Sequence, residues 1–481
     1  MRAKTQVNFA SSSGLRFNVC TDERYFMALW RRLRESRWMH NLLALPLLLL
    51  PYWVKWADPP APFAPTYVMG FLVSAAMLLA VIVWLLLGMP GITRFAQRGA
   101  HLSWAVMWGV FVFWAFITQT WAFVEKAQPG VAQNFGLQMA LVGSYAIMLA
   151  CAAPAPRFVI GLLTLDAMSV ALIGGTQVAC QCSLGLKALG EVTLNVARSG
   201  VSVIQGEGIR WLRPYGFLPH PNIAAGFLAV GVFAGAGVFL GLFSRRDRTS
   251  MHVFPLAALS LVIWAAIAWV LMLTFSRGAW LGVGIGGLAV LAGLIGRRDF
   301  RKPLIALALL AIGLSAVFFV LYRPLIVART GAGQENTEMR SLADRVVYGQ
   351  IAQAAIARAP VIGLGAGNTP WYAAYYLATY TDYDLQGDHV HNIYLETWSD
   401  LGVIGLVLFG LMQGFGLFAA GQAYRRTGDV ARLMMIGGWI GLAIVGLFDH
   451  YPWSLIMGQT LWVTLLAMAM AEAPMTTWQN S

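Results

Sequence analysis

Apolar runs of about 20 residues recur along almost the whole chain, and they constrain its fold more than any other feature. Of the 481 residues, 58% are hydrophobic and 11% are charged, whereas soluble proteins have roughly 45–50% apolar and about 25% charged residues. The runs are continuous and do not alternate at every second residue, which argues against a transmembrane β-barrel. We therefore expect an all-α, polytopic membrane protein.

The apolar runs predict about twelve membrane-spanning helices. They lie near residues 39–55, 67–88, 102–123, 132–152, 157–180, 222–242, 252–273, 279–296, 303–322, 401–423, 433–448 and 454–471. Two long polar segments interrupt them, at 183–221 and at 323–400, the second between the ninth and tenth helices. We expect residues 39–481 to form a single transmembrane domain after a tail of residues 1–38.

The positions of Lys and Arg predict the orientation in the membrane. Most of the 33 basic residues lie in the tail and in loops on one side, including 243–251, 297–302 and 424–432. Loops rich in Lys and Arg remain in the cytoplasm, so both termini should be cytoplasmic and both long segments should face the outside. The net charge of +12 then has a topological cause, and we expect no nucleic-acid partner.

The tail also contains an apolar pattern with helical spacing. Phe26, Leu29, Trp30 and Leu33 lie on one helix face, with arginines between them. This pattern is typical of an amphipathic helix on anionic membrane lipids, or of an ordinary juxtamembrane helix.

The predicted spans contain few residues that could take part in catalysis or ligand binding. Only Asp166 lies well inside a predicted span, either as a functional group or as an internally hydrogen-bonded residue. Cys180 and Cys182 are too close in sequence for an easy disulfide, and we expect no disulfide framework and no thiolate metal site. The chemical signal comes instead from three motifs near the outer ends of the spans.

The first motif is RWLRPYGFLPHPN at residues 210–222, ahead of the sixth predicted span. Arg210 and Arg213 can grip a phosphate through paired hydrogen bonds, or they can bind a lipid headgroup. The Pro-His-Pro-Asn sequence contains His220 and ends at Asn222, which can cap the helix.

The second motif, TFSRGAW at residues 274–280, is a sharp break between two apolar runs. Arg277 stands at its tip. It is either a second phosphate clamp or an interfacial anchor whose charged head reaches the water.

The third motif, DHVHNIYLETWSDLGVIG at residues 388–405, leads into the tenth predicted span. A His-Asn pair is followed by nine residues and a Gly-x-x-Gly sequence. Histidine titrates near neutrality, so His391 or His389 can take a proton from an attacking hydroxyl, with Asn392 or Asp388 orienting the ring. A structural histidine remains the alternative.

With the loop GLGAGN at 363–368, which we interpret as a tight glycine turn, these motifs resemble the O-antigen ligases and Wzy-type O-antigen polymerases in order and spacing. These bacterial membrane proteins share the so-called Wzy_C segment, and the resemblance covers about residues 205–450. It implies a glycosyltransferase that moves a glycan from a polyprenyl (undecaprenyl) diphosphate carrier to an acceptor at the periplasmic face of the inner membrane. The acceptor is the lipid A core in ligases, another lipid-linked repeat unit in polymerases, and Ser or Thr in related protein O-glycosylating enzymes.

By motif position, the resemblance implies that His391 is the essential histidine and that Arg213 and Arg277 are the essential arginines. Arg210 is a plausible substitute for Arg213. His389, Asn392, Asp388, His220 and Asn222 are expected to support them.

The large outer segment adds one further candidate. Residues 338–358 predict a helix, and Arg345 on it matches a recurring basic position of the family. Arg345 is either a third contact to diphosphate or sugar, or a partner of Asp344 or Glu338 in a structural ion pair. Aromatic residues from Trp371 to Tyr383 can stack on sugar rings or lie among the lipid headgroups.

The expected reaction needs no cofactor. Fixed guanidinium groups can stabilise a leaving diphosphate, and the sequence contains no Asp-rich metal motif, so we expect metal independence. A single in-line displacement with His391 as base would invert the anomeric carbon. A two-stage reaction would need a carboxylate nucleophile. Asp388, Glu396 and Asp400 are candidates, although we expect Glu396 and Asp400 on the surface of the helix entering the tenth span.

The sequence does not identify the acceptor, the sugars or the oligomeric state. Ligase is the leading hypothesis, and polymerase is the alternative. A lipid or glycan flippase or transporter is the alternative from another class, and a non-enzymatic scaffold is the third.

Overall fold

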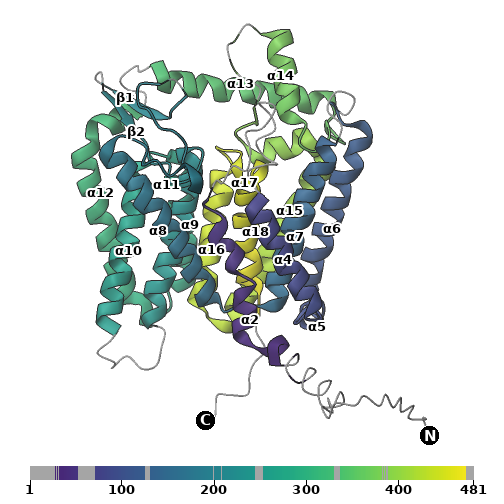
Figure 1. The fold of residues 1–481 in the computed structure, drawn as a ribbon, viewed down its shortest axis with the longest axis vertical. Coiled ribbons are helices and arrows are strands. Elements are labelled where there is room, and N and C mark those ends of the chain that lie inside the picture. Colours follow the sequence, from purple (N-terminus) through teal and green to yellow (C-terminus); the bar gives the residue numbers. More distant parts are fainter. Residues whose placement is uncertain are drawn as a thin grey trace, which may run out of the picture.

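The protein is a bundle of long helices, most of which run between the two ends of the molecule (Figure 1). The computed structural model describes residues 28, 30, 32–52, 71–124, 130–198, 200–206, 209–243, 253–329, 336–381, 383, 385 and 388–472. Phe26 and Leu29 of the predicted amphipathic helix lie outside these residues, as does almost all of the predicted loop at 243–251.

The first half of the chain supplies α2 (Arg37–Leu42), η1 (Leu45–Leu49), α4 (Phe71–Leu86), α5 (Ile92–Ala96), α6 (Gly99–Ile117), η2 (Thr118–Trp121), α7 (Val131–Ala152), α8 (Pro156–Cys180), η3 (Lys187–Leu189), β1 (Val203–Gly206), β2 (Ile209–Leu212) and α9 (Pro221–Phe243). The second half supplies α10 (Val253–Leu273), α11 (Arg277–Leu294), η4 (Arg298–Phe300), α12 (Arg301–Arg329), α13 (Asn336–Arg358), α14 (Thr369–Tyr380), α15 (Ile393–Thr427), α16 (Val430–Val445), α17 (Tyr451–Ser454) and α18 (Ile456–Met470).

The membrane-spanning architecture is confirmed. In the described part of the chain, eight helices are long and apolar enough to cross a membrane, and three shorter apolar helices lie at 72–86, 430–445 and 456–470. These eleven helices overlap eleven of the predicted spans. The remaining span, at 39–55, contains only the short α2 and η1 in its described part, because Pro46 and Pro51 cannot donate the amide hydrogen that a continuous helix requires.

Two helices extend beyond their predicted limits. α12 continues to Arg329 past a kink at Tyr322, next to Pro324, and α15 begins at Ile393 and kinks at Gly402. The large segment predicted at 323–400 is therefore shorter. α13 lies across the top of the bundle, and α14 stands upright at the same end (Figure 1). Charged residues near the helix ends hid these extensions in the sequence.

The core of the bundle is formed by α9 and α18. Every residue of α18 is buried, and α9 packs against α8, α10, α11 and α16. α11 lies so close to α16 that a Cβ at Gly282 or Gly286 would come within 2.5 Å or 2.4 Å of a carbonyl oxygen of α16. This close packing holds the first residue of α11, Arg277, in place at the upper end.

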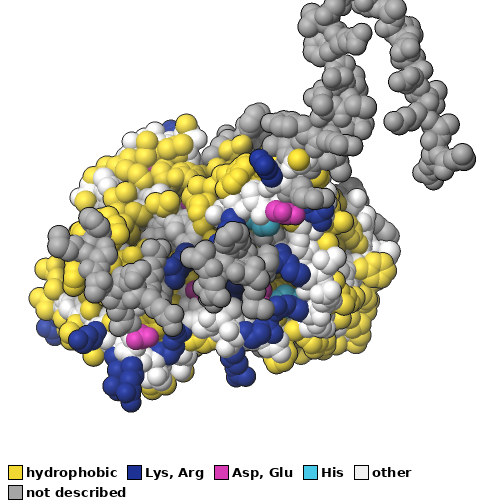
Figure 2. Space-filling view, turned by 90° about the horizontal axis from the view of Figure 1, so that it is seen from below, with side chains coloured by type: hydrophobic (Ala, Val, Ile, Leu, Met, Phe, Trp, Pro, Cys, Tyr) yellow, Lys and Arg dark blue, Asp and Glu magenta, His cyan; other side chains and the backbone are white. Residues whose placement is uncertain are grey.

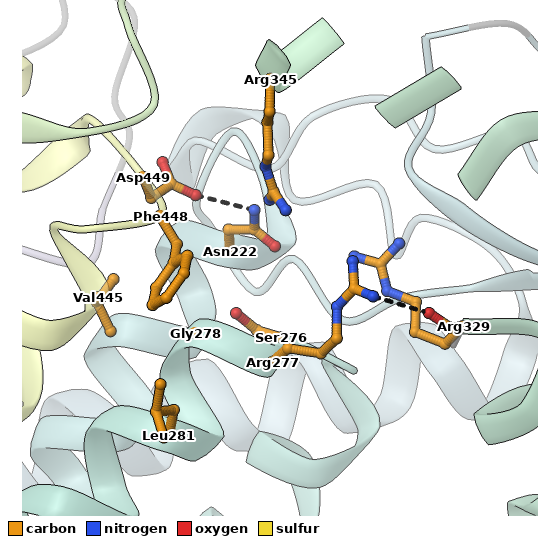
Figure 3. A pocket seen from close by; sticks show the side chains of 10 residues that line it. All are labelled: Asn222, Ser276, Arg277, Gly278, Leu281, Arg329, Arg345, Val445, Phe448 and Asp449. Atoms are coloured by element: carbon orange, nitrogen blue, oxygen red, sulfur yellow. Dashed lines mark hydrogen bonds between the residues drawn. The ribbon is translucent and has the colours of Figure 1, made fainter. Parts of the chain in front are cut away.

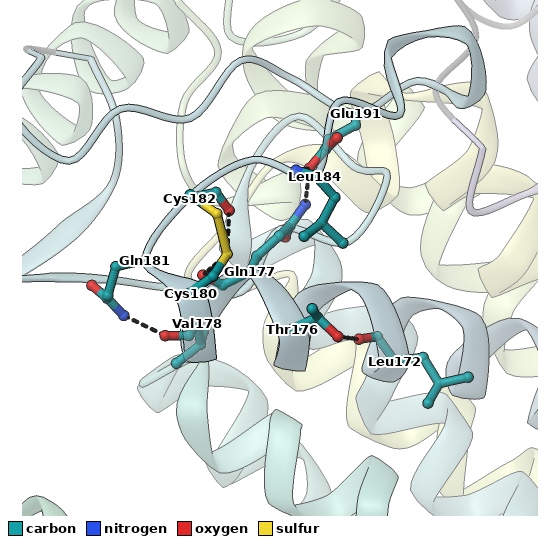
Figure 4. The surroundings of a disulfide bond; sticks show 9 residues. All are labelled: Leu172, Thr176, Gln177, Val178, Cys180, Gln181, Cys182, Leu184 and Glu191. Atoms are coloured by element: carbon teal, nitrogen blue, oxygen red, sulfur yellow. Dashed lines mark hydrogen bonds between the residues drawn. A yellow bond between two sulfur atoms is a disulfide. The ribbon is translucent and has the colours of Figure 1, made fainter.

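A disulfide joins Cys180 and Cys182, so the prediction of no disulfide is wrong for this pair (Figure 4). Gln181 ends α8 in the left-handed conformation, and this turn brings the two Cα atoms to 5.2 Å, within the range of disulfides. The Oε1 atom of Gln181 also accepts a hydrogen bond from the backbone of Leu212 at 2.7 Å. The α8 end therefore anchors β2, which pairs antiparallel with β1 in a short hairpin.

The loop GLGAGN is a tight turn, as predicted: all three of its glycines have positive φ angles. It lies against the start of α15, where the amides of Leu364 and Gly365 donate to the carbonyls of Ser399 and Asp400 at 2.8 and 2.9 Å. A Cβ at Gly402 would lie 2.0 Å from the carbonyl oxygen of Val361. The first glycine of the Gly-x-x-Gly sequence therefore permits this contact.

Glu396 and Asp400 are fully buried, so their predicted position on the helix surface is wrong. The carboxylate of Asp400 accepts hydrogen bonds from the amide of Gly367 and from the amide and hydroxyl of Thr369, at 2.6 to 3.1 Å. Asp400 thus ties the glycine turn and the start of α14 to α15, a structural role.

Arginines at the lower end of the bundle pair within the protein. Arg98 and Arg426 both form ion pairs with Glu472. Arg297 and Arg432 donate hydrogen bonds to backbone carbonyls, at 2.5 and 2.9 Å respectively. Seen from this end, Lys and Arg side chains are spread over the face, with fewer Asp and Glu among them (Figure 2). The basic loops at 297–302 and 424–432 and the three motifs therefore lie at opposite ends of the bundle.

Candidate active site

Four connections between helices bring the predicted site residues together at the upper end. They are the loop before α9, the turn between α10 and α11, the segment before α15 and the connection between α16 and α17. α13 covers them from above. Residues more than 200 positions apart in the sequence thus form one group.

A cavity of about 380 Å³ lies in this group (Figure 3). Its lining has a charged part, formed mainly by three arginines and one aspartate, and an apolar part at the ends of α11 and α16. The lining residues are Asn222, Ser276, Arg277, Gly278, Leu281, Arg329, Arg345, Val445, Phe448 and Asp449.

Three arginines approach the cavity from three helices. Arg277 begins α11 and donates to the backbone carbonyl of Arg329 at 3.2 Å, while the Nε atom of Arg329 donates to the carbonyl of Phe275 at 3.3 Å. Arg345 reaches the cavity from α13 (Figure 3). Each hydrogen bond fixes part of a side chain, and a guanidinium group, which has five N–H donors, is suited to bind an anion through paired hydrogen bonds.

The start of α11 adds to this positive field. Arg277 and Gly278 are its first two residues and both line the cavity. The backbone amides of the first helical turn have no acceptor within the helix, and the helix dipole is positive at this end. Arginine side chains and a helix N-terminus together are well suited to bind phosphate groups.

Arg213 does not line the cavity. Its side chain is only 2% exposed and donates to the carbonyl of Thr274 at 2.6 Å, to Ser202 Oγ at 2.9 Å and to Asn222 Oδ1 at 2.7 Å. The bond to Thr274 holds the turn that precedes Arg277. A phosphate contact by Arg213 stays a prediction, and the structure gives Arg213 a positioning role.

Asn222 links Arg213 to the cavity. It accepts from Arg213 and donates from Nδ2 to Asp449 Oδ2 at 2.8 Å. Asn222 is the second residue of α9 and is not the cap that the sequence predicts. Its backbone amide donates to His220 Nδ1 at 3.2 Å, so His220 caps the helix.

His391 lies beside Asp449 and His450. Its Nδ1 atom is 4.0 Å from Asp449 Oδ1, its ring contacts the His450 ring with centroids 5.1 Å apart, and Tyr348 of α13 lies on another side at 5.4 Å. Asp449 lines the same cavity as the three arginines, so His391 is connected to the cavity lining through Asp449.

Burial sets the charge states of this group. It lowers the pKa of His391 to about 4, with the nearby His450 acting in the same direction. Burial, followed by Arg213, lowers the pKa of His220 to about 3. Burial alone would raise the pKa of Asp449, but His391, His450 and His220 hold it below its ordinary value. At neutral pH His391 is therefore a neutral imidazole next to a carboxylate.

His389 has a different partner. Its Nδ1 atom contacts Glu396 of α15, and its ring stacks on His450 with centroids 4.9 Å apart. Neither Glu396 nor His450 lines the cavity, whereas His391 lies beside Asp449, which does; the supporting role of His389 stays a prediction.

The two residues predicted to orient His391 have other contacts. Asn392 caps α15 by accepting from the amides of Tyr394 and Leu395, both at 3.0 Å. Asp388 accepts from the backbone amide of His389 at 2.7 Å. The orienting carboxylate nearest to His391 among the described residues is instead Asp449.

Arg210 and Arg345, the remaining predicted arginines, differ in position. Arg210 is on β2 and donates to the carbonyl of Arg198 at 3.4 Å, away from the cavity lining. Arg345 lines the cavity. Asp344, its predicted ion-pair partner, accepts instead from Tyr383 at 2.9 Å, and the side chain of Glu338 lies outside the described residues.

The sequence did not identify Arg329, Asp449 and His450 as site residues. Arg329 ends a helix that was predicted to stop at residue 322, and the Asp449–His450 pair lies in FDHYPW, a break between two spans. The polar Asp-His pair between two apolar runs is the one sequence signal that could have identified Asp449 and His450.

Comparison with protein families bears on this arrangement. Residues 265–410 match the family model described as O-antigen ligase. The match confirms the family resemblance over this segment. A search of curated proteins gives no match.

The matched O-antigen ligase segment contains much of the site. Arg277, Arg329, Arg345 and His391 fall inside it, as do the glycine turn and the Gly-x-x-Gly sequence. The loop at 210–222 and the Asp449–His450 pair lie outside it, and the bundle brings them to the same cavity. The match supports a multi-pass membrane enzyme that processes glycans, of the ligase or polymerase type.

Proposed function

We propose that the protein is a membrane glycosyltransferase that moves a glycan from an undecaprenyl diphosphate carrier to an acceptor hydroxyl at the periplasmic face of the bacterial inner membrane. The single observation that carries this proposal is the cavity in which Arg277, Arg329 and Arg345 face Asp449, with His391 beside it. Its apolar lining by Leu281, Val445 and Phe448 suits the lipid end of such a donor.

The arginines would hold the leaving diphosphate. As the bond between the anomeric carbon and the phosphate oxygen breaks, negative charge grows on the diphosphate. Arg277 and Arg329 are anchored through backbone carbonyls, so their guanidinium groups need little reorganisation to meet that charge. This is the role for which planar, multidentate guanidinium groups are better suited than Lys.

His391 would act as the general base. It takes the proton of the acceptor hydroxyl while that oxygen attacks the anomeric carbon, and Asp449 stabilises the imidazolium that forms. The new glycosidic bond replaces the bond to phosphate in one displacement, which inverts the anomeric centre. The proposed step uses no metal, and metal independence stays a prediction.

A ligase, which would use a lipid A core acceptor, is the form of the activity that we favour, because the matching family model is described as O-antigen ligase. The polymerase alternative uses a second lipid-linked repeat unit. A deletion strain distinguishes them: full-length polymer left on the carrier indicates a ligase, and surface glycans of a single repeat indicate a polymerase.

The proposed topology places the cavity outside the cytoplasm. Thiols introduced at Gln350 of α13 and at Asp299 near the opposite end, both exposed, test it. In spheroplasts, an impermeant reagent should label the first and spare the second. The reverse pattern would invert the orientation and place the site in the cytoplasm.

The direct test uses purified protein with an undecaprenyl diphosphate-linked oligosaccharide and lipid A core, scored by gel shift of the acceptor. We expect transfer with and without EDTA, and strongly reduced transfer in Arg277→Lys. The matched control is Arg426→Lys at the lower end, which should keep near-normal transfer. Wild-type protein that transfers glycan to neither lipid A core nor a second donor would contradict the proposal.

A further inference from the structure

Two histidines and one carboxylate next to the cavity have the composition of a transition-metal site. His391, Asp449 and His450 each offer one ligand atom, and these atoms all lie within 4.8 Å of one another. Imidazole nitrogen together with carboxylate oxygen is a donor set preferred by Zn²⁺ and by neighbouring divalent transition metals.

The second shell already orients this group. Asn222 donates to Asp449 Oδ2, and Ser454 Oγ lies 2.7 Å from His450 Nδ1. Asp449 Oδ1 accepts from the backbone amide of His450 at 2.9 Å and has a second lone pair for a metal, and His450 can bind through Nε2. Ligands oriented by outer hydrogen bonds are typical of metal sites. The Nδ1 atom of His391 is buried without a hydrogen-bond partner among the described atoms, and Oδ1 of Asp449 is its nearest carboxylate oxygen, at 4.0 Å.

The distances require a modest closure. Four-coordinate Zn²⁺ with bonds of about 2.0–2.1 Å places its ligand atoms about 3.4 Å apart. The present separations, at most 4.8 Å, exceed this by up to about 1.4 Å, which side-chain rotation can supply. Asp449 faces the cavity, so a fourth position is open to water or to a phosphate oxygen.

The surrounding charges limit the affinity. Arg345 acts on His391 as a cation and opposes a second positive charge, and Arg213 acts in the same way on the neighbouring His220, whereas Asp388 favours positive charge at His391. His220 also faces Asp449 and is held neutral. We therefore expect moderate affinity.

We propose that His391, Asp449 and His450 bind a divalent transition metal of the Zn²⁺ class, and that the bound metal inhibits glycan transfer. The inhibition rests on the proposed function of His391. A neutral imidazole has one lone pair, and once a metal holds it, the other ring nitrogen carries the proton. The ring then cannot accept a proton from the acceptor hydroxyl, so metal binding and base catalysis exclude each other.

Binding is measured first, without donor or acceptor. Co²⁺ is titrated into full-length protein purified without a polyhistidine tag, and its visible d–d absorption reports nitrogen and oxygen ligands. We expect saturation at one equivalent, with Zn²⁺ displacing Co²⁺. Asp449→Asn and His450→Gln should each weaken binding by at least about 10-fold. His40→Gln is the matched control, since His40 is not part of the cluster and bonds to the carbonyl of Arg34.

Inhibition is measured second, in the transfer assay. Zn²⁺ should inhibit wild-type protein over the concentration range in which it displaces Co²⁺, and EDTA should restore transfer. Co²⁺ binding that is absent, or that is equal in wild type and Asp449→Asn, would overturn the metal site. Zn²⁺ binding without inhibition would overturn the inference that metal binding and base catalysis by His391 exclude each other. Protein that binds Co²⁺ at this cluster but never transfers glycan would contradict the proposed function and leave the metal site standing.

Discussion

Arginines at the two ends of the bundle have different partners. At the lower end, Arg98 and Arg426 pair with Glu472, and Arg297 and Arg432 donate to backbone carbonyls. Their positions follow the expected excess of basic residues on one side of the membrane, and their contacts join loop and helix ends.

At the upper end, Arg277, Arg329 and Arg345 converge on one cavity. The hydrogen bonds that Arg277 and Arg329 make to backbone carbonyls anchor them without filling the cavity. In this bundle, an arginine is assigned to the cavity by the direction of its guanidinium group. Its sequence neighbours alone do not decide this.

The largest expected effect concerns the base beside the upper arginines. His391→Ala should lower transfer by about 10²- to 10⁴-fold, because a positioned base contributes a factor of that size. His389→Ala should leave a measurable fraction, since His389 contacts Glu396 and His450, neither of which lines the cavity. The gel-shift assay measures transfer, and separate binding of the lipid-linked donor checks folding.

If His389→Ala is the inactive variant and His391→Ala keeps activity, the assignment of the base is wrong. If both keep activity, the proton leaves by another route, and Asp388 becomes the next residue to test.

The next effect compares the two ends directly. Arg277→Lys should lower transfer by about 10- to 100-fold, because Lys keeps the charge but loses the paired hydrogen bonds, which are worth about 1.5–3 kcal/mol. Arg426→Lys should change transfer by less than about twofold, because exposed ion pairs contribute little. Equal activity in both variants would reduce Arg277 to an interfacial anchor.

A smaller effect is expected on α13. Arg345→Lys should lower transfer by about 3- to 10-fold, because Arg345 is one of three cations that share the diphosphate charge. Arg340→Lys, on the same helix and outside the cavity lining, is the control. Equal rates for the two variants would remove Arg345 from the site.

The smallest effect on chemistry, and the largest on stability, is expected for Arg213. Arg213→Lys cannot keep all three of these hydrogen bonds and leaves a buried partner unsatisfied, at a cost of about 1–3 kcal/mol. Its thermal unfolding midpoint should fall by several degrees, whereas that of Arg277→Lys should stay near wild type. A stable but inactive Arg213→Lys would make Arg213 a direct substrate contact.

Most of the fold could be predicted from the sequence because membrane-spanning helices are recognised as continuous apolar runs. It failed where polar residues continue a helix. Glu396 and Asp400 looked like loop or surface residues, but contacts with His389 and with the turn at 363–368 allow them to be buried inside α15. Cys180 and Cys182 were misjudged because one left-handed residue suffices to bring them together.

The site was predicted in part. Arg277, Arg345 and His391 were found from local motifs, and they lie at or beside the cavity. Arg329 and Asp449 were missed because their importance arises from neighbours far along the chain. The hydrogen bonds that commit Arg213 to Thr274 and to other residues likewise cannot be read from the order of the motif.

The most direct test of the central claim is the location of the diphosphate. A cryo-electron microscopy structure of the protein with undecaprenyl diphosphate should place both phosphates in the cavity, within hydrogen-bond distance of the guanidinium groups of Arg277 and Arg329, with Arg345 nearby and the chain leaving past Leu281 and Phe448. Diphosphate density outside this cavity, with the three arginines making no contact to it, would contradict the account.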